Sequence, residues 1–124
     1  MSKKAIIFGV TGQDGSYLSE LLIQKKYRVY GIKRRASLNN NSRISHLLDH
    51  KNFNLIEGDV VDPIFVYSFI KDIQADEIYN LAAQSHVGES FNQPAYTIEV
   101  DLKGVLYILE AIRKDSKNSK FYQA

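Results

Sequence analysis

Short apolar runs alternate with amphipathic stretches along the whole chain. Four of these runs lie at residues 5–8, 28–32, 53–56 and 78–81, and a fifth begins at Phe121 and Tyr122. The first run, residues 5–8, is bounded by glycine and is typical of a strand buried on both faces, as in parallel sheets. Together the runs predict five strands.

The segments between the runs have helical spacing. After the first run, the apolar residues Tyr17, Leu18, Leu21 and Leu22 have the spacing of a helix. This helix is expected to end near Lys25 and Lys26, because cations are favourable at a helix C-terminus. A short helix is expected over residues 44–48, after a polar loop at 36–43. Pro63 suits the first turn of the next helix, with Asp62 as its N-cap.

Pro94 is expected to open the longest helix. Its apolar positions are Ile98, Leu102, Val105, Leu106, Leu109 and Ile112. A polar connection over residues 115–120 then leads into the fifth run. Strands that alternate with helices predict a parallel sheet covered on both faces. With right-handed crossovers, the fold class is an α/β, Rossmann-type doubly wound sheet of strand order 3-2-1-4-5, truncated after the fifth strand.

Composition narrows the class of protein. The chain has 124 residues, which suit one domain, and 44% of them are hydrophobic. A net charge of +2 argues against a nucleic-acid binder. There is no cysteine for a disulfide or thiolate metal site. No apolar run is long enough for a signal peptide or approaches the roughly 20 residues of a membrane span. We expect a cytoplasmic protein without membrane contact.

A glycine loop follows the first predicted strand and precedes the first predicted helix. It spans residues 9–15, with Gly9, Gly12 and Gly15 separated by two residues each. In sheets of this class the first glycine permits a tight turn, the second a close approach to a pyrophosphate, and the third the packing of the helix on the strand. The alternative is an ordinary turn, but the strand–loop–helix context favours phosphate binding.

The end of the second predicted strand is basic. An NAD site places an acidic residue there, to bind the ribose 2′-hydroxyl. This chain has Lys33, Arg34 and Arg35 instead. A guanidinium can bind a 2′-phosphate through two hydrogen bonds, whereas a carboxylate would repel it. The alternative is a solvated basic patch, but the position favours NADP as the cofactor.

Several blocks together carry a family likeness. They are Gly-Val-Thr-Gly-Gln-Asp-Gly-Ser-Tyr at 9–17, Gly-Ile-Lys-Arg-Arg at 31–35, Gly-Asp at 58–59, Tyr-Asn-Leu-Ala-Ala at 79–83, Ser-His-Val at 85–87 and Phe-Tyr-Gln-Ala at 121–124. With these blocks the whole chain resembles the GDP-mannose 4,6-dehydratases, members of the extended short-chain dehydrogenase/reductase group. The resemblance implies the N-terminal, NADP-binding part of such an enzyme, with the catalytic and substrate-binding parts absent from residues 1–124.

The resemblance also implies which residues contact the cofactor. The family would place the loop residues from Gly9 to Asp14 on the pyrophosphate, and Arg34 or Arg35 on the 2′-phosphate. The implied contacts are Gly9, Val10, Thr11, Gly12, Gln13 and Asp14 for the pyrophosphate, Gly15 at the end of the same loop, Asp59 and Val60 for the adenine, Leu81, Ala82, Ala83, Gln84 and Ser85 for the ribose and nicotinamide, and Tyr96 for the cofactor region. Glu89 departs from the family pattern, where a small or apolar residue is usual.

The family's chemistry is a cycle of hydride transfer. NADP takes a hydride from C4 of the hexose of GDP-mannose, water leaves across C5 and C6, and the hydride returns to C6. The resemblance implies a homo-oligomeric full-length enzyme. It also implies that the catalytic Ser/Thr and Glu follow the fifth strand, with a Tyr-x-x-x-Lys pair later. These positions lie beyond Ala124, so we expect no catalytic residue in this chain.

Some residues imitate catalytic or metal sites. Tyr67 and Lys71 have the Tyr-x-x-x-Lys spacing, but this spacing is also that of ordinary helix packing. His86 follows the fourth predicted strand and is either a hydrogen-bonding loop residue or a catalytic one. Ser85 is the better candidate for a substrate or nicotinamide contact. No cluster of His, Cys, Asp and Glu suggests a metal.

Two other functions compete with the dehydratase. A non-catalytic NADP(H)-binding sensor module would share the glycine loop and the basic strand end. Another extended family member, such as an epimerase, is disfavoured by the Gln-Asp and Lys-Arg-Arg blocks. The sequence ending in mid-fold favours the enzyme fragment.

Overall fold

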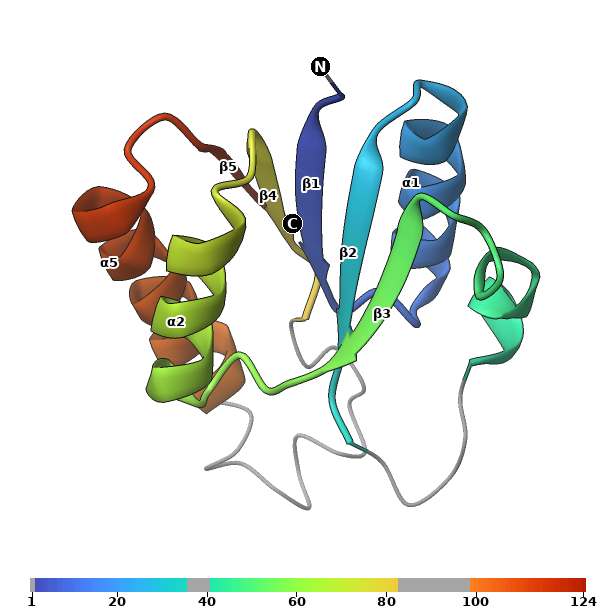
Figure 1. The fold of residues 1–124 in the computed structure, drawn as a ribbon. Coiled ribbons are helices and arrows are strands. Elements are labelled where there is room, and N and C mark those ends of the chain that lie inside the picture. The colour runs from blue at the N-terminus through green and yellow to red at the C-terminus, as the bar shows by residue number, and fades with distance from the viewer. Residues whose placement is uncertain (1, 36–40, 83–98) are drawn as a thin grey trace, which may run out of the picture.

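Five parallel strands form one sheet in the order β3-β2-β1-β4-β5 (Figure 1). The computed structural model describes residues 2–35, 41–82 and 99–124, without the side chains of residues 99 and 100. The strands are β1 Lys4–Phe8, β2 Arg28–Lys33, β3 Phe53–Glu57, β4 Glu77–Asn80 and β5 Lys120–Gln123. The predicted order and parallel direction are confirmed, and every strand begins or ends within one residue of its expected bounds.

Helices connect the strands as the periodicity predicts. They are α1 Gln13–Gln24, the 3₁₀ helix η1 Ser42–Leu47, α2 Pro63–Ile73, the π-helical η2 Glu99–Gly104 and α5 Val105–Asp115. The predicted N-cap is confirmed, because the Asp62 carboxylate accepts hydrogen bonds from the backbone N–H groups of Ile64 and Phe65 at 3.1 and 3.3 Å. The expected polar loop at 36–43 is too long by two residues, since Ser42 and Arg43 belong to η1. The expected helix start at Pro94 lies outside the described residues.

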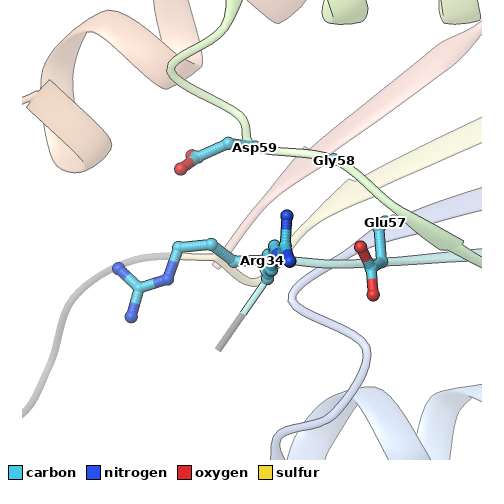
Figure 2. A pocket seen from close by; sticks show the side chains of 5 residues that line it. Arg34, Glu57, Gly58 and Asp59 are labelled. Carbon is cyan, nitrogen blue, oxygen red and sulfur yellow. The ribbon is translucent and has the colours of Figure 1, made fainter. Parts of the chain in front are cut away.

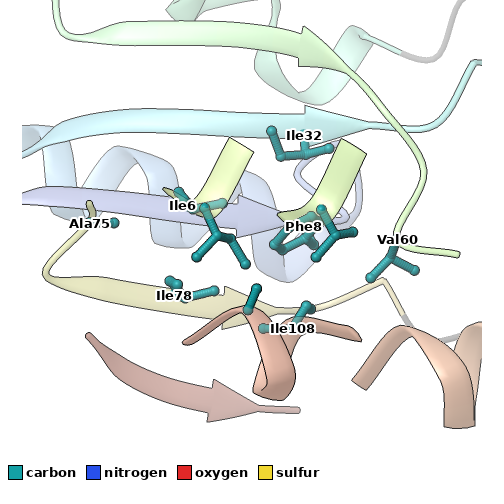
Figure 3. Close-up of a cluster of buried hydrophobic side chains, with 10 residues drawn as sticks. Ile6, Phe8, Ile32, Val60, Ala75, Ile78 and Ile108 are labelled. Atoms are coloured by element: carbon teal, nitrogen blue, oxygen red, sulfur yellow. The ribbon is translucent and has the colours of Figure 1, made fainter. Parts of the chain in front are cut away.

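The two faces of the sheet are covered by different helices (Figure 1). Successive side chains of a strand point to opposite faces, so β1 contributes to both cores. Ile6 and Phe8 pack with residues of α2 and α5, in the cluster of Figure 3. Ala5 and Ile7 pack with residues of α1 and η1. The first core consists of Ile6, Phe8, Ile32, Val60, Val66, Ile70, Ala75, Ile78, Ile108 and Ala111.

The buried face of α1 differs from the one that the apolar pattern suggests. Tyr17 and Leu21 are 60% and 48% exposed, whereas Ser16 and Ser19 are buried. The Ser16 and Ser19 hydroxyls donate to backbone carbonyls of the same helix, at 2.9 and 2.7 Å. Small side chains whose hydroxyls are satisfied locally let α1 approach the sheet closely, which turns the larger residues outward.

The same effect appears in α5 and the turn before it. Leu102, Leu106 and Leu109 are exposed, although the pattern listed them with the apolar face. The buried positions are Gly104, Ile108 and Ala111. A Cβ on Gly104 would come within 2.8 Å of the Val60 side chain, so the end of η2 approaches the segment after β3 closely at its glycine. In the part of the chain that the structure describes, no helix is long and apolar enough to cross a membrane.

Candidate functional site

The carboxyl ends of β1 to β4 meet at one edge of the sheet. The backbone N–H of Gly9 donates to Ile32 at 3.1 Å, that of Gly58 to Lys33 at 2.9 Å, and that of Leu81 to Phe8 at 2.9 Å. The segments that follow these four strands are therefore neighbours, although they lie far apart in the sequence. Ligands in open α/β sheets bind at this edge, so we take it as the candidate site.

The glycine loop has the geometry that its spacing predicts. Gly9 has φ +80°, and a Cβ there would come within 2.5 Å of the Leu81 carbonyl oxygen. A Cβ on Gly15 would come within 2.7 Å of the Gly9 carbonyl oxygen, so α1 packs directly on the loop. Around Gly12, by contrast, the nearest atom to a Cβ is 3.6 Å away. Two glycines therefore serve the protein's own packing, and the second leaves room on its surface for a ligand.

The other loop residues divide between core and surface. Val10 is fully buried, and its side chain lies against Gly31, so only its backbone can face a ligand. Gln13 and Asp14 are exposed in the first turn of α1. The free N–H groups of a helix start and its positive dipole end favour anions. The loop thus offers backbone donors for an anion, with one acidic side chain nearby.

A cavity of about 550 Å³ opens beside the ends of β2 and β3 (Figure 2). It is lined by Arg34, Arg35, Glu57, Gly58 and Asp59. Both predicted arginines and the predicted Asp59 therefore share one cavity. Guanidinium groups suit a phosphate, and carboxylates suit hydroxyl or amino donors, so the cavity can bind an anion that also carries sugar or base donors.

Glu57 is a cavity residue that the sequence reasoning missed. It is the last residue of β3 and pairs in register with Lys33 of β2. Its signal in the sequence is its place directly before the Gly58 and Asp59 block. The pairing of the two strand ends brings an acidic residue beside the basic run, which no pattern within either strand indicates.

Val60 belongs to the core more than to the cavity. It is 4% exposed, and its side chain packs on Gly104. The Asp59 carboxylate accepts a hydrogen bond from the Val61 backbone N–H at 3.1 Å, which fixes the turn after β3. The adenine contact through Asp59 stays a prediction. Val60 can contribute to it chiefly by packing in the core beneath the cavity.

The end of β4 is held by a residue that the sequence reasoning did not single out. Asn80 is 1% exposed. Its side-chain amide donates to the Gln123 side chain at 2.8 Å, and its carbonyl accepts from the Ala82 backbone N–H at 3.2 Å. Asn80 thereby positions Leu81 and Ala82 relative to β5. The other predicted contacts of this region, Ala83, Gln84, Ser85 and Tyr96, lie outside the described residues, as do His86 and Glu89.

Tyr67 and Lys71 do not face the candidate site. The Tyr67 ring packs edge-on against Tyr107 of α5, with centroids 6.2 Å apart, and the Lys114 ammonium lies 6.0 Å from its centroid. Lys71 is exposed in the last turn of α2. These contacts support the packing interpretation of this pair. Among the described residues, no group of three His, Cys, Asp or Glu side chains could hold a metal ion.

Two tyrosines with raised pKa values, Tyr27 and Tyr79, lie toward the opposite edge of the sheet. The Tyr27 and Tyr79 hydroxyls donate to the two oxygens of Glu77, at 2.7 and 2.6 Å. Burial and then the Glu77 hydrogen bond raise the pKa of Tyr79, and the Glu77 hydrogen bond is the main cause of the raised pKa of Tyr27. Both phenols therefore stay neutral, and the trio is a structural tie between β4 and the start of β2.

Comparisons with known proteins agree on one family. Residues 6–124 match the family model described as GDP-mannose 4,6 dehydratase. The chain is 50% identical to the GDP-mannose 4,6-dehydratase of Vibrio cholerae over 131 aligned positions, covering 100% of this chain and 35% of that protein. It is 51% identical to the enzyme of the same name from Yersinia enterocolitica, covering 98% of this chain and 35% of that protein.

A solved structure extends the likeness to the fold. The Bordetella bronchiseptica enzyme WbmH, in complex with NAD+, is 28% identical with a TM-score of 0.78, covering 98% of this chain and 38% of that one. The chain thus spans about 35% of the length of the curated relatives that it matches.

Proposed function

This chain belongs to the GDP-mannose 4,6 dehydratase family, and from that premise we propose that it is the NADP-binding part of a GDP-mannose 4,6-dehydratase. The proposed cofactor site runs along the carboxyl edge of the sheet, from the glycine loop to the ends of β2, β3 and β4. A nicotinamide dinucleotide is supported by the related WbmH structure, which holds NAD+.

The cavity at the ends of β2 and β3 is the observation that carries the choice of NADP. Arg34 and Arg35 line it from β2, at the position where NAD sites carry an acid. Two guanidinium groups can neutralise the two charges of a ribose 2′-phosphate and donate several hydrogen bonds to it. Glu57 and Asp59 complete the lining, and they suit the hydroxyl and amino donors of the adenosine.

The chain's own residues would bind and orient the cofactor. The pyrophosphate would lie at Gly12, which is half-buried and has no protein atom closer than 3.6 Å to a Cβ built there, and the start of α1 would direct its dipole at the phosphates. Leu81 and Ala82 follow β4 toward the proposed nicotinamide, held by Asn80. When bound, NADP supplies the acceptor and donor of the hydride that passes through the hexose. The proposed substrate of the full-length enzyme is GDP-mannose, which the family description and the names of the relatives support.

Calorimetric titration of the full chain tests the proposal. We expect NADP+ to bind more tightly than NAD+, because only NADP+ carries the 2′-phosphate that two arginines can bind. Equal affinities would reject the choice of NADP while keeping a dinucleotide site. Binding of neither cofactor would reject the site itself.

A further inference from the structure

Arg43 lies against the glycine loop from outside the predicted site. It belongs to η1, and its Nη1 donates to the Thr11 carbonyl oxygen at 3.4 Å. A separate hollow of about 330 Å³ lies here, lined by Gln13, Ser16, Tyr17, Glu20 and Arg43. In the sequence Arg43 lies in the expected polar loop, and no motif there indicates a function for it.

Arg43 is carried by a firmly packed element. Ile44 and Leu47 lie on one face of η1 and are 0% and 6% exposed in the core under α1. The His46 imidazole lies 2.6 Å from the Glu20 carboxylate of α1. The Lys33 ammonium donates to the Asn41 side chain at 3.1 Å, just before η1. The Arg43 backbone is therefore fixed relative to α1 and β2, and η1 lies beside α1 (Figure 1).

The contact acts on one particular peptide plane. The Thr11 carbonyl and the Gly12 N–H belong to the same planar peptide and point in opposite directions. The Gly12 N–H donates to the Gly9 carbonyl at 3.3 Å, and Arg43 binds the other end of the plane. Both ends of the peptide at the second glycine are thus held before any ligand arrives, which reduces the conformational entropy lost on binding.

The charge of Arg43 adds to this effect. The guanidinium stays protonated at every ordinary pH. It lies one peptide away from the surface at Gly12 that admits a diphosphate. A cation at this distance favours an anion in the loop, and salt weakens the attraction because Arg43 is exposed.

We propose that Arg43 is a positioning residue for the glycine loop, and that it strengthens binding of the diphosphate group common to NAD and NADP. This inference rests on the proposed function of the loop as a dinucleotide site. The inference gives the arginines of this edge two different roles. Arg34 and Arg35 would decide between the cofactors, whereas Arg43 would strengthen the binding of both equally.

Titrations of NADP+ and NAD+ into the full chain, by calorimetry, test this role in three variants. In Arg43→Gln we expect both dissociation constants to rise by a similar factor of roughly two to five, the effect typical of one exposed charge near its counterion. Arg43→Lys, which keeps the cation, should lose less. Arg113→Gln is the matched control, because Arg113 is exposed in the last turn of α5, where it pairs with Glu110 at 2.9 Å. It should leave both constants unchanged.

Thermal unfolding of the ligand-free variants separates positioning from general stability. We expect Arg43→Gln to melt close to the unsubstituted chain, because Ile44 and Leu47 hold η1. An unchanged affinity in Arg43→Gln, beside clear binding by the unsubstituted chain, would overturn the inference alone. So would a loss confined to NADP+, or equal losses in the Gln and Lys variants with a lowered melting temperature. Binding of neither cofactor by the unsubstituted chain would overturn the proposed function and this inference with it.

Discussion

Among single residues, Arg34 and Arg35 occupy the position where NAD sites of this fold class carry an acidic residue. Both line the cavity beside β2 and β3. We expect the double substitution Arg34→Ala and Arg35→Ala to weaken NADP+ binding by roughly 1.5–3 kcal/mol per charged hydrogen bond removed. NAD+ binding should change little, because NAD+ has no 2′-phosphate. Calorimetry with both cofactors measures the difference.

A control for this experiment removes two cations from the other edge of the sheet. Lys25 and Lys26 are exposed just before β2 begins. Their replacement by alanine lowers the net charge by the same amount without touching the cavity. If this pair weakened NADP+ binding as much as the arginine pair, the effect would be one of overall charge, and the assignment of the 2′-phosphate would be wrong.

A second single-residue prediction concerns Asn80 and the stability of the fold. Its buried side chain bonds both Gln123 and the Ala82 backbone N–H. Asn80→Ala leaves these groups without their partner, and we expect the free energy of unfolding to fall by about 1–3 kcal/mol. Denaturant titration measures this. Asn54→Ala, at an exposed position of β3, is the matched control and should stay within about 0.5 kcal/mol of the unsubstituted chain.

At the scale of elements, α2 depends on the cap at its start. The Asp62 carboxylate accepts from two of the backbone N–H groups that the helix cannot satisfy itself. We expect Asp62→Ala to destabilise the chain by about 1 kcal/mol, as measured by denaturant unfolding. Asp72 is exposed near the end of the same helix, where a negative charge opposes the dipole. A cost from Asp72→Ala equal to that from Asp62→Ala would contradict the capping argument.

The whole molecule sets two further expectations, of which the first concerns catalysis. By family resemblance, the groups that transfer protons and complete the hydride cycle follow Ala124, and Tyr67 is packed between α2 and α5. We therefore expect the 124-residue chain to form no 4-keto-6-deoxy sugar from GDP-mannose and NADP+. Chromatography of the sugar nucleotides tests this, with the full-length Vibrio cholerae relative as positive control. Product from the purified chain would require a new examination of Tyr67, Lys71 and His86.

The second expectation concerns association between molecules. β5 pairs with β4 on one side, and within the described ranges no strand pairs with its other edge. Tyr122 on this strand is 60% exposed, and so are large parts of Leu102 and Leu106. Open strand edges and apolar patches recruit other chains. We expect the chain to self-associate at micromolar concentration and to have marginal stability.

Light scattering and thermal unfolding test this expectation together. A chain extended to the length of its relatives is the natural comparison. We expect it to aggregate less and to be more stable than the 124-residue chain. A monodisperse monomer with a cooperative, high melting temperature would contradict the expectation. It would also increase the weight of the NADP(H)-binding sensor as the function of these residues.

The elements and their order could be predicted from the amino-acid pattern alone. Each apolar run became a strand, with β1 buried on both faces and β5 largely exposed. The alternation with helices left few topologies. The glycine loop and the Asp62 cap could also be predicted from the sequence, because such features depend on neighbours within a few residues. The cavity could be anticipated at the ends of the strands, since parallel strands bring these ends to one edge.

The surfaces that meet between elements, by contrast, are set by three-dimensional packing. The apolar pattern could not indicate that α1 buries Ser16 and Ser19 while Tyr17 faces outward. Nor could it indicate that Glu57 joins the arginines, or that Arg43 reaches Thr11. These relations join residues from separate elements, and they depend on how closely the backbones approach and at what register. Periodicity along a chain specifies which side of an element is apolar, but the contact between two elements depends on the shapes of both.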